Sequence, residues 1–276
     1  MNRYLQALLL ALALGAFPAW AQAEVYSVAV VPQYTVSKIY RSWKPLLAQL
    51  EQETGHSFKL LVYPGFKEFE QDYLKGVPDF IYYNPYHQLT GHQQQGYVPL
   101  VRDGQRKLKG IIVVRKDSDL ARISDLNGKL IAFPAPNAFA ASLYMRALLR
   151  EREGIDFEAR YIDSHSNGYR HVLHGRADAA GGVMRSLDSQ PANVRERLKI
   201  IYETPGNPPH PIAVHPRIDA NVQAQVTEAL IRLQDSTAGL KLLAAIQMSS
   251  PVKADHERDY APLGNLGLQR YYKEYE

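Results

Sequence analysis

The sequence predicts an α/β protein of two lobes, each a mostly parallel sheet flanked by helices. Short β-rich runs alternate with helical patterns along most of the 276 residues, which is typical of parallel sheets covered by helices. One block of this alternation is bracketed by two turn-rich segments, as expected for a lobe inserted into another. With 46% hydrophobic and 22% charged residues, the chain can form a core in each lobe.

The first 23 residues have the pattern of a secretory signal peptide. Arg3 supplies the positive start, residues 7–16 form an apolar run too short to span a bilayer, and Ala21–Ala23 fits a small-x-small cleavage site. We therefore expect export to the periplasm and a mature chain that begins at Glu24. The sequence contains no cysteine, which excludes disulfides and thiolate metal ligands.

The first lobe is expected to begin directly after this segment. Its predicted strands are Val25–Val31, Phe58–Tyr63 and Asp79–Tyr83. Between the first two strands, Ser37 precedes a helical pattern that ends at Gly55 and places five apolar side chains on one face, namely Ile39, Trp43, Leu46, Leu47 and Leu50. Phe66–Lys75 forms a short amphipathic helix. Asn84 and Pro85 then form an N-cap and first helical position.

The second lobe is expected to follow the same alternation. Its predicted strands are Gly110–Arg115, Lys129–Phe133, Ala159–Asp163, Ala177–Val183 and Leu198–Tyr202. Asn137 is positioned to cap a helix that runs to about Arg152, and Tyr169–His174 has a helical pattern.

After the Pro-rich stretch, the chain is expected to return to the first lobe through the strand Ile212–Val214 and a long helical stretch, Asn221–Gln247, that is interrupted near Gly239. We therefore expect residues 24–108 and 206–276 to form lobe 1 and residues 109–205 to form lobe 2. The two crossings, Gly104–Lys109 and Thr204–Pro211, would form a hinge beside a cleft.

Composition and motifs argue against several function classes. The formal net charge is +4, without a basic cluster interleaved with aromatics, so no nucleic-acid partner is predicted. The sequence contains no G-x-S-x-G elbow, P-loop or H-E-x-x-H motif, and we predict no enzyme, no catalytic residue and no cofactor. His171 and His174 are spaced to share a metal ion but lack a suitably spaced third ligand, so no metal site is predicted.

Five stretches resemble periplasmic solute-binding proteins of phosphonate, phosphite and phosphate ABC transporters. They are VVPQYTVSKIYRSWKPLLAQLEQETG, LKGVPDFIYYNPY, IIVVRKDSDLARISDLNGKLIAFPAP, HSNGYRHVLHGRADAAGGV and NPPHPIAVHP, in the family order. The resemblance implies the type II periplasmic-binding fold and a monomer that delivers a small-molecule ligand to an inner-membrane ABC permease. A sensory subunit that reports to a membrane histidine kinase or cyclase remains the alternative.

In such a fold the ligand cleft lies where strands end and helices begin. From lobe 1 this predicts a set of aromatic and polar binding residues: Tyr34, Tyr82, Tyr83, Asn84, Tyr86 and His87. Because neighbouring residues of a strand point to opposite faces, some of these tyrosines must instead pack in the core. From lobe 2 the predicted binding residues are Asn137, Ala138, Phe139, Ala140 and His165.

The second lobe departs from the family pattern at its helix start. Phosphonate-type members carry a Ser-Thr-Ser run there, and the matching positions in this chain are Ala138, Phe139 and Ala140. The hydroxyls are absent and an aromatic ring is present, although the backbone N–H groups remain. His165 matches the family's cleft histidine, and a loop histidine bonded to backbone is the alternative. We therefore expect a small organic solute, for example a carboxylate, and weak binding of phosphonates, phosphite and phosphate.

Overall fold

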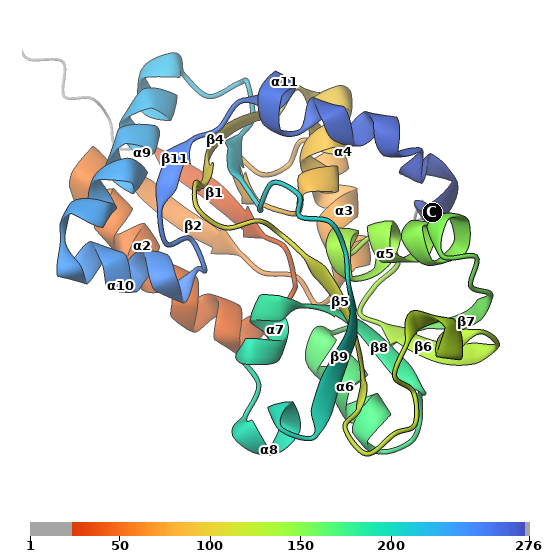
Figure 1. The fold of residues 1–276 in the computed structure, drawn as a ribbon. Coiled ribbons are helices and arrows are strands. Elements are labelled where there is room, and N and C mark those ends of the chain that lie inside the picture. Colours follow the sequence, from red (N-terminus) through yellow and green to blue (C-terminus); the bar gives the residue numbers. More distant parts are fainter. Residues whose placement is uncertain (1–23, 274–276) are drawn as a thin grey trace, which may run out of the picture.

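The computed structural model describes residues 24–273 and shows the predicted two-lobed α/β fold (Figure 1). Residues 1–23, which contain the predicted signal peptide, lie outside the described residues, so that prediction is not tested by the structure. Of the helices described, none combines the length and the apolar composition that crossing a membrane requires.

The first lobe is built on a six-stranded sheet with the order β11-β4-β10-β3-β1-β2. These strands are Pro251–Lys253, Val98–Asp103, Ile212–Val214, Phe80–Tyr82, Val25–Val30 and Ser57–Leu61. The helices of this lobe are α2 (Val36–Thr54), α3 (Phe66–Leu74), α4 (Pro85–Gln95), α9 (Ala220–Arg232), α10 (Thr237–Ala245) and α11 (His256–Asp259). In Figure 1 the blue C-terminal segments lie beside the red and orange N-terminal ones, because the chain returns to this lobe after leaving it.

The second lobe is built on a five-stranded sheet with the order β7-β6-β8-β5-β9. These strands are Phe157–Tyr161, Lys129–Phe133, Ala179–Val183, Gly110–Arg115 and Leu198–Glu203. One helical stretch follows β6 in three parts, which are η2 (Phe139–Leu143), α5 (Tyr144–Ala147) and η3 (Leu148–Arg152). The other helices are η1 (Ile123–Leu126), α6 (His165–Leu173), α7 (Met184–Asp188) and α8 (Ala192–Arg195).

Both sheets are mixed, whereas the alternation of strands and helices in the sequence predicts mostly parallel pairing. In the first sheet β1 pairs in parallel with β2 and β3, whereas β10 pairs antiparallel with β3 and β4. In the second sheet β5 is antiparallel to both β8 and β9, while β6 is parallel to β7 and β8. The parallel pairs are those that a crossover helix connects. β5 and β10 enter their sheets from the hinge crossings, so no crossover helix fixes their direction.

All five strands from β5 to β9 lie in one sheet, and the predicted residue bounds of the two lobes stay a prediction. The predicted inward face of α2 is confirmed, because its buried residues are the five apolar ones that the pattern selects. The predicted cap is wrong by two positions: the side chain of Thr35, not of Ser37, accepts a hydrogen bond at the start of α2. The predicted cap and proline at Asn84 and Pro85 are confirmed.

The sequence pattern does not predict two strands of the first sheet, β4 and β11. β4 contains Pro99, which lowers the strand propensity of its segment, and β11 has only three residues. The predicted interruption of the long helical stretch after β10 is confirmed: the stretch is broken by the turn η4 (Leu233–Asp235) and by Ser236, three residues before Gly239, and the side chain of Ser236 caps α10. The C-terminal segment continues through η5 (Ala261–Leu266) and η6 (Leu268–Tyr271) to the side of the second lobe.

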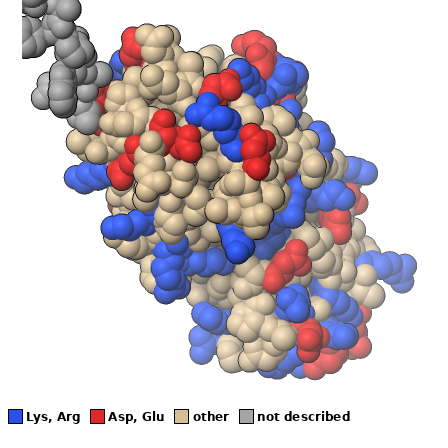
Figure 2. All heavy atoms as spheres, turned by 90° about the vertical axis from the view of Figure 1, so that its left-hand side faces the viewer, with Lys and Arg blue, Asp and Glu red and all other residues tan. Residues whose placement is uncertain are grey.

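The apolar cores show how the lobes are joined. The largest cluster of buried apolar residues fills lobe 1 and continues into the start of η2, including Phe139, Ala140 and Ala141. Two further clusters cover the two faces of the second sheet. On the face seen in Figure 2, Lys and Arg side chains are interspersed with Asp and Glu side chains over both lobes.

Candidate ligand-binding site

A small cavity lies between the lobes, where the sequence places the cleft. Its lining comes from both lobes and from the hinge crossings, and comprises Gln33, Phe66, Asn84, Leu108, Ala138, Phe139, Ala140, Ala141, His165, Val183 and His210. Its free volume is ≈ 10 Å³, about the space that one water molecule occupies. A solute larger than one water molecule therefore fits between these residues only if the cavity widens.

The start of η2 forms one wall of the cavity. The N–H groups of Phe139, Ala140 and Ala141 lie in the first turn, where a helix offers no internal acceptor. Two glycines let this turn lie directly on the second sheet. A Cβ at Gly110 would stand 2.0 Å from the carbonyl oxygen of Ala140, and one at Gly181 would stand 2.2 Å from that of Ala141. The sheet thus fixes where these N–H groups point.

The ring of Phe139 crosses from lobe 2 to lobe 1. It stacks on Tyr86 with 6.4 Å between the ring centroids and 4° between the planes. It also stacks on Tyr144, with 5.6 Å between the ring centroids. Phe139 and Tyr86 therefore form an aromatic contact between the two lobes.

The predicted tyrosines divide between the cleft and the core. Tyr86 faces lobe 2, and Tyr82 stacks on His210, which lines the cavity, at 5.4 Å. Tyr83 is fully buried inside lobe 1, where its hydroxyl donates to Gln88, so it does not line the cavity. Register decides this division, because Tyr82 and Tyr83 are neighbours on opposite faces of the same strand end.

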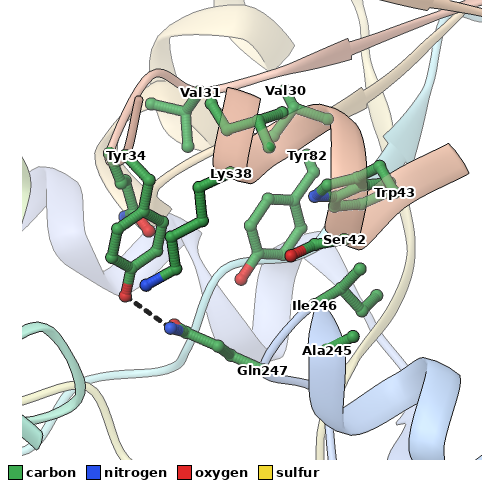
Figure 3. A pocket seen from close by; sticks show the side chains of 12 residues that line it. Val30, Val31, Tyr34, Lys38, Ser42, Trp43, Tyr82, Ala245, Ile246 and Gln247 are labelled. Atoms are coloured by element: carbon green, nitrogen blue, oxygen red, sulfur yellow. Dashed lines mark hydrogen bonds between the residues drawn. The ribbon is translucent and has the colours of Figure 1, made fainter. Parts of the chain in front are cut away.

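Tyr34 lines a second small pocket of lobe 1, about 30 Å³ in volume, that also contains Tyr82 (Figure 3). The side-chain amide of Gln247 donates to the hydroxyl of Tyr34. The ammonium of Lys38 lies over the Tyr34 ring, 3.7 Å from its centroid. Burial raises the pKa of Tyr34, so this hydroxyl stays protonated at neutral pH. Tyr34 is thus held at the edge of the lobe interface, outside the lining of the interlobe cavity.

Two asparagines form a polar bridge between the lobes. Asn84 caps α4 by accepting from the N–H of His87, and its amide donates to the carbonyl oxygen of Asn137 at 3.0 Å. Asn137 does not cap the following helix as predicted, since Ala138 occupies the N-cap position. Its side chain is instead held by Lys273, whose N–H donates to it and whose carbonyl accepts from it.

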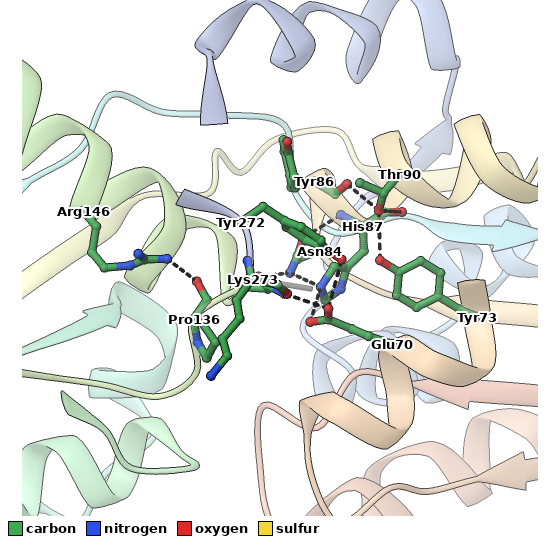
Figure 4. Close-up of polar contacts among 11 residues, drawn as sticks. Glu70, Tyr73, Asn84, Tyr86, His87, Thr90, Pro136, Arg146, Tyr272 and Lys273 are labelled. Carbon is green, nitrogen blue, oxygen red and sulfur yellow. Dashed lines mark hydrogen bonds and ion pairs between the residues drawn. The ribbon is translucent and has the colours of Figure 1, made fainter. Parts of the chain in front are cut away.

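Sequence reasoning missed Glu70, which lies at the centre of this bridge (Figure 4). The carboxylate is 1% exposed and accepts hydrogen bonds from Asn137 at 2.7 Å and from Tyr272 at 3.0 Å. His87 Nε2 lies 3.2 Å from its other oxygen. A signal was present in the sequence, because Glu70 follows Phe66 by four residues and therefore lies on the buried face of α3.

The three histidines of this region are buried. His165 begins α6 and its Nδ1 lies 3.2 Å from the hydroxyl of Ser186. Burial lowers the pKa of His165 to about 4 and that of His210 well below its usual value. Both rings are therefore neutral at pH 7. His87 is fully buried in lobe 1 against Glu70 and does not line the cavity. His210 and Gln33 contact each other and both line the cavity. The sequence does not predict them as binding residues, although both lie in the stretches that resemble the family.

The buried state of His165 predicts a pH-dependent stability. Its pKa is about 4 in the folded protein and about 6.5 in the unfolded chain. Between these values the unfolded chain binds the extra proton, so stability is lost as the pH falls. We expect this group to lower the free energy of unfolding by about 2 kcal/mol between pH 7 and pH 5.

Urea unfolding of the wild type and of His165→Asn at several pH values measures this contribution. The lowered pKa of His210 acts in the same direction. Because both proteins contain His210, both keep this further pH dependence. Parallel pH profiles for the two proteins would show that His165 does not contribute.

Comparisons with known proteins agree with this fold. The sequence matches, over residues 28–260, the family described as ABC transporter, phosphonate, periplasmic substrate-binding protein. A binding-protein component of an ABC phosphonate transporter from Pseudomonas aeruginosa has a TM-score of 0.80 and 16% identity, covering 90% of this chain and 88% of that one. PhnD1 from Prochlorococcus marinus, solved with methylphosphonate, has a TM-score of 0.80 and 14% identity, covering 88% and 97%.

A third solved structure, from Xanthomonas citri, has a TM-score of 0.73 and 18% identity, and covers 90% of this chain and 98% of that one. It was solved with chloride and with ATP. At these identities the structures show the shared fold, and the family match extends over most of the chain.

Proposed function

Because this chain belongs to the family of periplasmic substrate-binding proteins of phosphonate ABC transporters, we propose that it binds a small organic solute, uncharged or with one negative charge, for such an uptake system. The family is a binding component of transporters and not an enzyme family. The proposal concerns the ligand, and it is motivated by Ala138, Phe139 and Ala140, where the resemblance leads us to expect hydroxyl side chains.

This proposal rests on the cavity lining, in which the described residues include no Asp, Glu, Lys or Arg side chain. Among the residues described there, the only titratable side chains are His165 and His210, and burial keeps both neutral at pH 7. A phosphonate or phosphate dianion needs several convergent donors, because a buried charge without partners costs more than its burial gains. The N–H groups at the start of η2 offer hydrogen bonds for a carboxylate or a neutral polar group.

Aromatic side chains support an apolar or planar body for the solute. Phe139 and Tyr86 stack across the interface, and Phe66 lines the cavity from lobe 1. When the lobes part, the faces of Phe139 and Tyr86 separate and become available to a ligand. Such surfaces bind apolar or planar groups through area and ring stacking.

We infer the movement of the lobes and the delivery of the solute from the family to which the chain belongs. We propose that residues 24–108 and 206–276 move against residues 109–205 about the two crossings, so that the lobes open and close over the solute. An exported monomer, processed after Ala23, would deliver the solute to an inner-membrane ABC permease. Solute-dependent growth that requires this chain would distinguish uptake from the alternative role in a membrane sensor.

Calorimetric titration with methylphosphonate, 2-aminoethylphosphonate, phosphite and phosphate tests the ligand class. We expect dissociation constants weaker than about 1 μM for all four. Native mass spectrometry of protein purified without refolding would identify a carried solute directly. Submicromolar binding of any of the four anions would contradict the proposed ligand class.

A paired substitution tests whether the start of η2 sets this preference. Ala138→Ser with Phe139→Ser restores hydroxyls at two family positions, and we expect at least about tenfold tighter binding of one of these anions. Ala192→Ser, on the distant helix α8, is the matched control and should change nothing. An unchanged affinity in the paired variant would place the ligand elsewhere.

A further inference from the structure

Two histidines and a glutamate converge on lobe 1, away from the interlobe cavity. His92 lies in the last turn of α4, and His256 and Glu257 begin α11. The two helices, far apart in the sequence, lie near each other in Figure 1. The imidazole rings of His92 and His256 stack with 3.6 Å between their centroids. The fold therefore creates a cluster that spacing along the chain does not reveal.

The ligand atoms of this cluster are close enough to share one ion. One nitrogen of each histidine and one oxygen of Glu257 all lie within 4.8 Å of one another. In a tetrahedral zinc site with bonds of 2.0–2.2 Å, the ligand atoms are about 3.3 Å apart. His256 is half-buried and Glu257 is exposed, so rotation of these two side chains can bring their ligand atoms toward His92.

Neighbouring groups orient one of the histidines as metal sites require. His92 Nδ1 donates to the carbonyl oxygen of Tyr97 at 3.0 Å, which leaves Nε2 with its lone pair. Gln88 donates to the same carbonyl at 3.0 Å and lies 3.4 Å from His256 Nδ1. The contact to His256 is long and therefore weak, so it yields readily to a stronger ligand.

We propose that His92, His256 and Glu257 bind a zinc ion, with water completing the coordination, and that this ion fastens α11 to α4. Two imidazoles and a carboxylate are ligands that suit zinc. Calcium and magnesium take mainly oxygen ligands, of which this cluster has few. The inference does not depend on the identity of the solute in the cavity, since no residue of the cluster lines it.

The chain offers a matched control for this site. His171 lies in the last turn of α6, and His174 is the residue that follows this helix. Both line a surface pocket with Arg170 and Arg176. His171 Nδ1 is hydrogen-bonded to the carbonyl oxygen of Asn167 at 2.9 Å, as His92 is to Tyr97. This pair has no carboxylate in its pocket, and two arginines oppose a cation there. It should bind zinc only weakly.

Untagged protein, freed of metal by chelation, would be titrated with zinc and followed by calorimetry, and with cobalt followed by visible absorption. We expect one zinc per chain, a higher melting temperature with zinc, and a cobalt spectrum of four-coordinate type. His92→Gln and His256→Gln should each weaken zinc binding at least about tenfold. Glu257→Gln should weaken it less, and His171→Gln with His174→Gln should leave it unchanged.

Circular dichroism and urea unfolding of the zinc-free variants would establish that they fold. The proposal is overturned if the wild type binds no stoichiometric zinc, or if folded His92→Gln binds zinc as tightly as the wild type. Loss of binding in the His171 and His174 variant alone would also overturn it.

Discussion

Replacement of Gly181 by alanine is expected to lower the free energy of unfolding by about 4 kcal/mol. The new Cβ would stand 2.2 Å from the carbonyl oxygen of Ala141 and 2.5 Å from the ring of Phe133. Gly181 lies in β8, within the second sheet, and the backbone of η2 covers it. Neither the strand nor the helix start can move without breaking its own packing, so the strain remains in the folded state.

Urea unfolding followed by circular dichroism measures this effect. Gly264→Ala is the matched control, because the nearest atom to a Cβ at that position is 3.8 Å away, and it should change stability little. Gly181→Ala should also weaken solute binding in protein that still folds, since the new Cβ displaces the N–H groups of η2. A loss of less than about 1 kcal/mol would show that the helix start lifts from the sheet easily.

The elements that the sequence predicts best are those fixed by local chemistry. The inward face of α2 follows from helical periodicity, and the start of α4 follows from an asparagine cap and a proline. The strand Ile212–Val214 is predicted at its observed bounds. In each case neighbouring residues along the chain decide the structure, so a pattern is enough.

Contacts between distant segments decide the features that the sequence does not reveal. Asn137 has a suitable side chain and position for a cap, but Glu70 and the backbone of Lys273 bind that side chain instead. The zinc ligands proposed above likewise come from α4 and α11. Alternation predicts that Tyr82 and Tyr83 face opposite sides, but only the packing of lobe 1 determines which one reaches the cleft.

Replacement of Glu70 by alanine is the second change with a large expected effect, again about 4 kcal/mol of unfolding free energy. Its carboxylate serves as acceptor for Asn137 and Tyr272 and contacts His87. Removal would take this acceptor from the buried His87 and Asn137 and from the half-buried Tyr272, and each buried group left unpaired costs about 1–3 kcal/mol. Glu70→Gln keeps the shape and one acceptor oxygen, so it should cost clearly less than the alanine variant.

The comparison with Glu68→Ala isolates this network, because Glu68 lies on the same helix but is exposed, and its loss should be nearly neutral. Urea unfolding of the three variants gives the ranking. Glu70 lies in lobe 1, whereas Asn137 lies in lobe 2 and Tyr272 in the C-terminal segment, so the network holds all three together in the closed arrangement. If Glu70→Ala proved as stable as Glu68→Ala, water would have to satisfy the donors that the carboxylate now satisfies, and the lobes would close without this bridge.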